Sequence, residues 1–317
     1  MNISEAKDKI AEIRENIGKV IVGKDDVINK VLICLIADGH VLLEDLPGTG
    51  KTMMSKALAV SIDSRFSRIQ FTPDLLPADI TGLNVYNRAS ESFNYVPGPV
   101  ITNILLADEI NRATPRTQSA LLEAMQERQV TVDGDTRKLD DPFFVIATQN
   151  PVETAGTFPL PEAELDRFMM ELSIGKLTLE DEIKMLNRFE NEEPLDTLSS
   201  VATGEDIIEI RKLLSEVSIH KDLVEYIAKL SEVTRADSGT YMGVSPRGSL
   251  ALLKAAKTSA LINGRNYVLP DDIKQLIVPV FLHRILFVNR KDKVSKLQYL
   301  EALISRVEVP SEEFETA

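Results

Sequence analysis

The most informative segment of the chain is Glu44-Asp45-Leu46-Pro47-Gly48-Thr49-Gly50-Lys51-Thr52. It follows an apolar run at 41–43 and precedes a segment rich in helix formers, so the glycines are predicted to lie between a strand and a helix. Such a turn points backbone N–H groups and the positive end of the helix toward a phosphate. Lys51 can reach the outer phosphates of a nucleotide, and the Thr52 hydroxyl suits a magnesium ion. The stretch therefore predicts a phosphate-binding loop.

One position departs from the general pattern of such loops, which has a glycine where this chain has Asp45. The inner glycines and the lysine are intact. The alternative is a glycine turn that only caps an ordinary helix. On the phosphate-loop interpretation, the nucleotide contacts Pro47, Gly48, Thr49, Gly50, Lys51, Thr52 and Met53.

The composition is that of an ordinary globular protein with an acidic balance. The 317 residues suffice for two domains, or for one large domain with an appendage. The net charge of −13 argues against non-specific binding to nucleic acids and anionic membranes. The lone cysteine, Cys34, excludes a disulfide within the chain and is predicted to be buried, because its neighbours are apolar. No apolar run reaches the roughly 18 residues that a membrane span needs, so we expect a cytoplasmic protein.

The apolar pattern divides the chain into two parts. Strands alternate with helices up to about residue 175, which predicts a parallel sheet covered on both faces, and helical periodicity dominates from residue 179 onward. We therefore predict an α/β fold: a P-loop αβα sandwich over residues 1–175, with N-terminal helices, and an all-α domain over residues 176–317. The expected elements are helices at 4–18 (ended by Gly18), 25–37, 75–80 and 114–128, and strands at 40–44, 69–71, 104–107 and 143–148.

Two hairpins are predicted within the α/β part. Residues 82–99 alternate apolar and polar side chains between turn-forming asparagines and end in Pro97-Gly98-Pro99. A second hairpin is predicted at 129–139, with its turn at 133–135. The segment 82–99 looks like an insertion between the regular elements.

Two acids follow directly after the apolar strand at 104–107. Asp108 suits a magnesium ion held through water, and Glu109 suits polarisation of the water that attacks a terminal phosphate. Alone, such a pair is more often a solvated strand end. The phosphate-binding loop earlier in the same alternating pattern favours the nucleotide interpretation.

At this point the chain resembles a known family, the MoxR proteins among the AAA+ ATPases. The likeness spans roughly residues 15–285, and acid at position 45 is common among MoxR-like sequences. The insertion at 82–99 sits where this family, magnesium chelatase subunits and the MCM helicases interrupt their second helix. The motifs, in family order, are Leu42 to Thr52, Ala107-Asp108-Glu109-Ile110-Asn111-Arg112-Ala113, Ala147-Thr148-Gln149-Asn150-Pro151, Leu165-Asp166-Arg167-Phe168 and Ser245-Pro246-Arg247.

The resemblance implies roles for side chains outside the loop. Asn150 matches the first sensor, an amide that orients the attacking water; the alternative is that it caps the turn before Pro151. Arg247 matches the second sensor, on the first turn of a lid helix with Ser245 as its cap and Pro246 as its first residue.

Arg167 matches an arginine finger, which a subunit offers to the nucleotide of its neighbour. We expect Arg247, in contrast, to converge with the acids on the loop of its own subunit. Surface salt bridges are the alternative for both arginines. The resemblance further places Val22 and Gly23 against the adenine.

Two details stay open. Arg112 and Arg116 match positions that face a subunit boundary in such rings, or they pair with local acids. After 173–175 the family usually has tyrosine and proline, whereas this chain has Lys176-Leu177, so the hinge between core and lid is less certain than the catalytic part.

The resemblance implies an ATPase that uses ATP and Mg²⁺ and assembles into a ring, most commonly a hexamer. Such proteins are chaperone-like remodellers that mature protein complexes or insert metal cofactors, with a protein client and often a partner that has a von Willebrand factor A domain. Two alternatives remain. A DNA-acting motor would need basic hairpins, which Arg88, Arg137 and Lys138 hardly provide beside four aspartates. A slow nucleotide switch would not need Glu109, Asn150 and Arg167, so neither a nucleic-acid partner nor a mere switch is expected.

Overall fold

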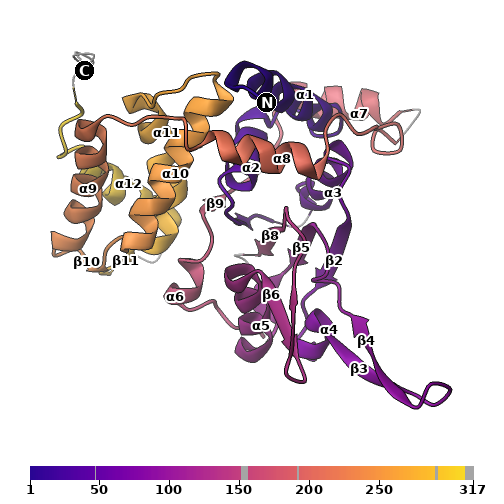
Figure 1. Ribbon diagram of the computed structural model, residues 1–317. Coiled ribbons are helices and arrows are strands. Elements are labelled where there is room, and N and C mark those ends of the chain that lie inside the picture. Colours follow the sequence, from indigo (N-terminus) through magenta and orange to yellow (C-terminus); the bar gives the residue numbers. More distant parts are fainter. Residues whose placement is uncertain (47, 151–155, 191–192, 290–291, 311–317) are drawn as a thin grey trace.

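The computed structural model describes residues 1–46, 48–150, 156–190, 193–289 and 292–310. Within these ranges a five-stranded sheet, with strand order β2-β5-β8-β1-β9, occupies the centre of the N-terminal half (Figure 1). All neighbouring strands in it are parallel, as predicted. The strands are β1 (Val41–Glu44), β2 (Phe66–Gln70), β5 (Ile104–Asp108), β8 (Phe144–Gln149) and β9 (Met170–Leu172).

Helices cover both faces of this sheet. Neighbouring residues of one strand point to opposite sides, so Leu105 and Leu106 of β5 belong to two different buried clusters. The Leu106 side packs against α1 (Ile3–Val20), α2 (Asp25–Ile36) and α3 (Lys51–Ser61). The Leu105 side packs against α4 (Pro77–Thr81) and α5 (Pro115–Glu127). The predicted αβα sandwich is therefore confirmed, and Cys34 of α2 is buried, where desolvation raises the pKa of its thiol.

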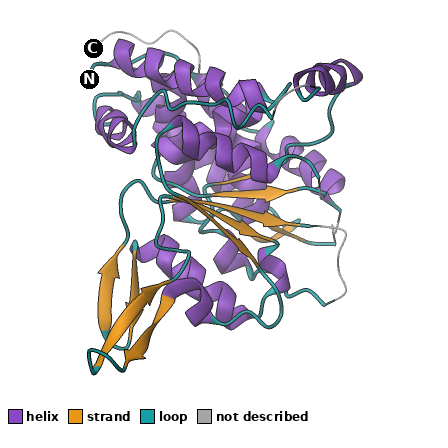
Figure 2. Cartoon of the chain, turned by 90° about the vertical axis from the view of Figure 1, so that its right-hand side faces the viewer, coloured by secondary structure: helices purple, strands orange, loops and turns teal. Residues whose placement is uncertain are grey.

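Both predicted hairpins are present and lie side by side beyond the layer of α4 and α5 (Figure 2). They are β3–β4 (Gly82–Asn87 and Ser92–Pro97) and β6–β7 (Gln129–Val132 and Asp135–Lys138). The Asn84 amide donates a hydrogen bond to Asp133 at 2.8 Å. The Arg137 guanidinium lies 4.1 Å from the centre of the Tyr95 ring. The two hairpins therefore support each other.

The C-terminal half is helical and packs closely on the first half. The buried cluster on the α1–α3 side of the sheet continues without a break into α9, α10 and α11. A short antiparallel pair, β10–β11, is the exception to the predicted all-α composition. None of the described helices is long and apolar enough to cross a bilayer. The elements after β9 are α7 (Leu179–Arg188), α8 (Gly204–Leu213), α9 (Lys221–Ala236), β10 (Thr240–Met242), α10 (Pro246–Ile262), α11 (Pro270–Phe281), the 3₁₀ helix η2 (Leu282–Arg284), β11 (Leu286–Phe287) and α12 (Lys293–Ile304).

Two predicted boundaries are wrong. Gly18 does not end the first helix: α1 continues to Val20, whose side chain is buried in the core, and the burial outweighs the low helix propensity of one glycine. Strand β2 covers Phe66–Gln70 rather than 69–71, because β5 offers a partner to each of its five residues, from Ile104 opposite Phe66 onward.

Candidate functional site

The loop between β1 and α3 forms the predicted turn. Gly48 and Gly50 have φ values of 83° and 90°, in the left-handed region that favours glycine. Gly50 is the N-cap of α3, so the first N–H groups of this helix are available to a ligand at the loop. The loop borders a pocket of about 430 Å³, lined by Gly48 to Met53, Arg68, Gln70, Asp108, Glu109 and Asn150. We call it the loop pocket; the predicted contact Pro47 lies outside the described residues.

Lys51 and Thr52 both line the loop pocket. The Lys51 ammonium donates hydrogen bonds to the carbonyl oxygens of Asp45 (2.9 Å) and Leu46 (3.4 Å), so its side chain is folded back along the loop. The Thr52 hydroxyl and the Asp108 carboxylate line the same pocket and are the hard oxygen donors that Mg²⁺ prefers. The described residues contain no group of three His, Cys, Asp or Glu able to hold a metal alone. An ion here would need further oxygens from phosphates or water.

Asp108 and Glu109 lie at the carboxyl end of β5, and Thr148 of β8 holds both. The Thr148 hydroxyl donates to the Asp108 carboxylate at 2.7 Å and accepts the Glu109 backbone N–H at 2.8 Å. Glu109 has a φ of 56°, so the chain turns sharply and its side chain enters the loop pocket. Both carboxylates are largely shielded from solvent, unlike those of a solvated strand end.

Two side chains of β2 that line the loop pocket were not predicted from the sequence. Arg68 donates to the Asp108 carboxylate at 2.6 Å, and the Gln70 amide donates to the Glu109 carboxylate at 2.8 Å. Gln70 lies opposite Asp108 in the parallel register, so both residues reach the same edge of the sheet. Alternation of the polar Arg68 and Gln70 around the buried Ile69 was the available signal.

Asp45, the departure from the glycine pattern, is buried and has three partners in the segment after β9. Its carboxylate accepts hydrogen bonds from the Ser173 hydroxyl (2.7 Å) and from the backbone N–H groups of Ile174 (2.6 Å) and Gly175 (3.1 Å). A glycine could make none of these bonds. The aspartate therefore ties the start of the loop to the segment that leads into the helical half.

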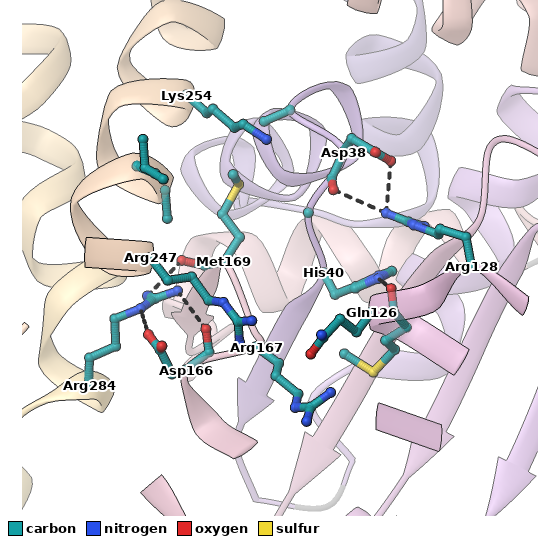
Figure 3. Close-up of a pocket in the computed structure, with 15 residues that line it drawn as sticks. Asp38, His40, Gln126, Arg128, Asp166, Arg167, Met169, Arg247, Lys254 and Arg284 are labelled. Atoms are coloured by element: carbon teal, nitrogen blue, oxygen red, sulfur yellow. Dashed lines mark hydrogen bonds and ion pairs between the residues drawn. The ribbon is translucent and has the colours of Figure 1, made fainter. Parts of the chain in front are cut away.

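Arg167 and Arg247 share a different pocket, of about 400 Å³, which we call the arginine pocket. Figure 3 shows Arg247 reaching from α10 toward Arg167. Among the described residues none lines both pockets. Arg247 was expected to converge on the loop of its own subunit; in this structure it does not line the loop pocket, and the packing of α10 directs the side chain toward Arg167.

Asp166, the residue before Arg167, joins the start of α10 to Arg284. Its carboxylate accepts a hydrogen bond from the Ser245 hydroxyl at 2.9 Å and pairs with the Arg284 Nε at 2.8 Å. Ser245 in turn caps α10, whose first residue is Pro246, as predicted. Core and helical half are thus joined beside the arginine pocket.

Arg284 was also missed by the sequence analysis. It is almost fully buried, which lowers the pKa of its guanidinium, while the Asp166 carboxylate raises it. It also donates to the carbonyl oxygens of Phe168 (2.6 Å) and Met169 (3.1 Å). A cation in the apolar stretch 280–287 was the signal for such a buried pair.

Only some of the hydrogen-bond donors of the Arg167 guanidinium have an acceptor among the described residues. Its Nη1 donates to the Leu122 carbonyl at 3.1 Å. Its Nε is buried and has no hydrogen-bond partner within the described part of the chain. A buried guanidinium donor without an acceptor is uncommon in folded proteins.

The remaining predicted residues lie as follows. Asn150 is buried and lines the loop pocket. Val22 and Gly23 do not line that pocket, although the preceding Ile21 side chain lies 3.9 Å from the place that a Cβ of Gly50 would take. Arg112 donates to the Glu109 carboxylate at 2.9 Å, and Arg116 is exposed on the first turn of α5.

Comparisons with known proteins agree with this geometry. The family "ATPase family associated with various cellular activities (AAA)" matches residues 40–170, and an AAA lid domain matches residues 232–301. Chaperone MoxR1 of Mycobacterium tuberculosis is 39% identical over 303 residues, which cover 92% of this chain and 80% of that protein. The chain belongs to the MoxR family of AAA+ ATPases.

Two other similar proteins extend this result. The uncharacterised protein YeaC of Bacillus subtilis is 50% identical to this MoxR chain and covers 93% of both chains. The crystal structure of a Cytophaga hutchinsonii protein, provisionally assigned as an ATPase, matches with a TM-score of 0.90 at 40% identity, over 98% and 97% of the two chains. The sheet, its helices and the helical lid are therefore those of a known AAA+ structure.

Proposed function

We propose that this protein is a Mg²⁺-dependent ATPase that works as a hexameric ring, with each ATP between the loop pocket of one copy and the arginine pocket of the next. One observation carries the proposal. The cations that would stabilise a terminal phosphate, Arg167 and Arg247, lie together but apart from the loop pocket of the same chain. Only a second copy can bring the two halves together.

In the loop pocket the chain's own groups bind and orient the reactants. The N–H groups at the start of α3 bind phosphate oxygens, and Lys51 exchanges its two carbonyl partners for the outer phosphates. Glu109 polarises the attacking water, and Asn150 orients it. Thr52 and Asp108 would hold Mg²⁺, which supplies positive charge to the phosphates when bound. Gly48, Thr49 and Met53 line the same space.

In the arginine pocket, Arg167 and Arg247 stabilise the negative charge that develops on the neighbour's terminal phosphate. Arg167 supports this role because its guanidinium lines the same pocket as that of Arg247. The contacts of Asp166 with Ser245 and Arg284 keep both cations in position before the neighbour arrives. We thus assign Arg247, like Arg167, to the neighbour's nucleotide.

The use that the protein makes of ATP hydrolysis is proposed here from its membership of the MoxR family. We propose a core over residues 1–175 and a lid over residues 176–317, with the hinge at 173–175, and a chaperone-like remodelling of a protein client. A von Willebrand factor A domain partner, complex maturation or cofactor insertion, an adenine site at Val22 and Gly23, and a cytoplasmic location stay predictions. A DNA motor is disfavoured because Arg137 lies over Tyr95 and pairs with Asp135 within the hairpins.

A mixing experiment tests the shared site. Purified Lys51→Ala chains and Arg167→Ala chains are each expected to hydrolyse ATP far more slowly than wild type. Mixed in equal amounts, they should recover a substantial fraction of the activity, because an intact loop can then meet an intact arginine. A mixture of Arg167→Ala with Arg247→Ala chains is the control, since each supplies a defective arginine pocket. No recovery in the first mixture, with both variants folded and assembled, would contradict the proposal.

A further inference from the structure

Helix α7 carries an apolar face that points into solvent. Leu179, Ile183 and Leu186 follow one another at helical spacing and are 75%, 50% and 60% exposed. None of the ten residues of α7, all of them described, is buried. The sequence pattern is that of an amphipathic helix that turns this face toward a core. In a single chain the face has no such cover.

The position of α7 is fixed on the side of the molecule that carries the loop. The Lys24 ammonium donates to the Lys176 carbonyl at 2.7 Å, and Arg188 donates to the carbonyl oxygens of Gly18 (2.6 Å) and Lys19 (3.0 Å). The helix therefore lies against the turn between α1 and α2. Ile21 of that turn borders Gly50 of the loop, so α7 flanks the loop half of the nucleotide site.

An apolar groove flanks the other half. It has a volume of about 420 Å³ and runs between α9 and α10, where Val224, Ile227 and Leu253 contribute to its lining. Leu250, an exposed residue of α10, lines both this groove and the arginine pocket. The groove is therefore continuous with the surface that carries Arg247, one helical turn earlier.

We propose that α7 of one copy docks into the α9–α10 groove of the neighbouring copy. This inference rests on the proposed function, in which the loop half of one copy meets the arginine half of the next. Figure 1 shows α7 and the α9–α10 pair on opposite sides of the molecule, as a head-to-tail ring contact requires. Bringing the two halves together brings these two flanking apolar surfaces together as well.

Charge favours this pairing over a contact between two α7 helices. The first turn of α7 is acidic, and Glu180 and Glu182 in this turn are exposed, whereas Asp181 pairs with Lys184 of the same helix. The groove and the adjoining part of α10 present basic side chains, Arg235, Arg247 and Lys254. Opposite charges across an interface select the correct partner, and like charges disfavour the α7–α7 alternative.

A cysteine pair tests the contact directly, because the native Cys34 is buried and does not interfere. Chains with Ile183→Cys alone and chains with Leu250→Cys alone should each form few disulfide-linked dimers when oxidised with ATP present. Their mixture should form disulfide-linked dimers, and the double variant a ladder of larger species. The matched control replaces Leu250→Cys by Val294→Cys on α12, which is 64% exposed.

Three results would overturn the inference. They are linking of the Ile183–Leu250 pair no stronger than that of the control pair, linking of Ile183→Cys chains to themselves, and a wild-type chain that never assembles. The third would also refute the proposed function. Recovery of hydrolysis in the mixing experiment together with either of the first two results would refute only the docking of α7.

A charge substitution adds an independent measurement. Ile183→Glu places a carboxylate in the proposed apolar contact and should raise the protein concentration at half-assembly by about tenfold or more. ATP binding to the dilute, unassembled chain should stay as in wild type, because Ile183 does not line the loop pocket. Val294→Glu is the control. Unchanged assembly of Ile183→Glu, measured by light scattering, would contradict the inference.

Discussion

The loop pocket and the arginine pocket are similar in volume, about 430 and 400 Å³, but they are built in different ways. The loop pocket gathers one continuous stretch and the carboxyl ends of neighbouring parallel strands. The arginine pocket gathers segments from residue 37 to residue 284, on both sides of the joint between core and lid. The first depends on local geometry and the second on how two large parts pack. Binding of ATP and its hydrolysis should therefore be separable by mutation.

The largest effect should come from the arginine pocket. Arg167→Ala should lower kcat by about 1000-fold, or about 4 kcal/mol, because a fixed cation in phosphoryl transfer is lost. The Kd for ATP of the dilute chain should not change, because Arg167 does not line the loop pocket. Steady-state hydrolysis and a nucleotide-binding titration measure the two quantities. Arg14→Ala on α1 is the control, and a weaker Kd in Arg167→Ala would place this arginine in its own subunit's site.

Asp166→Ala should act on the stability of the same region. It leaves the buried Arg284 guanidinium without its carboxylate partner, which should lower the free energy of unfolding by about 3 kcal/mol. Chemical denaturation measures this change. Asp140→Ala removes a partner from Arg65 at an exposed ion pair and should cost less than about 1 kcal/mol. Equal losses in the two variants would show that Asp166 does not hold the joint.

In the loop pocket, Glu109→Gln should lower kcat by about 100-fold, because an amide cannot polarise the attacking water. ATP binding should persist, so the variant should trap nucleotide and hold assembled copies together. Glu123→Gln, exposed on α5, is the control. If Glu109→Gln retained wild-type turnover, the assignment of this residue would be wrong.

The smallest effect should come from Thr148→Val, a change of nearly equal volume that removes the hydroxyl shared by Asp108 and Glu109. Loss of both bonds should lower kcat by about tenfold through poorer positioning of the two carboxylates. Thr258→Val removes a buried hydroxyl from α10, so it should lower stability without a change in kcat per folded chain. A similar kcat in the two variants would remove Thr148 from the positioning of the site.

The two pockets also differ in how much of each could be predicted from the sequence. The sheet, the hairpins and the convergence of Lys51 and Asp108 followed from the alternation of strands and helices, because parallel strands end at one edge. The place of Asn150 followed from the resemblance to MoxR proteins. The direction of Arg247 did not follow, because it depends on how α10 packs across the joint. The pairing of Arg284 with Asp166 did not follow either, because Asp166 lies 118 positions earlier in the chain.

Helix α7 shows a second limit of the sequence. Its apolar spacing predicted a helix correctly. The same spacing occurs in helices whose apolar face packs on the chain's own core and in helices whose apolar face is exposed. Ile183 and Leu186 are exposed, and only the packed structure distinguishes the two cases. Similarly, β9 has three residues, too few to give a recognisable alternation.

Asp45 gives the loop a mechanical role in addition to its chemical one. Its carboxylate accepts three hydrogen bonds from residues 173–175, where we propose the hinge, so the loop is tied to the segment that leads into the helical half. A shift of the loop on binding or release of phosphate would be transmitted to the lid without passing through the sheet. In the proposed ring, each chemical step would then move the lid from the same point at which the chain binds its nucleotide.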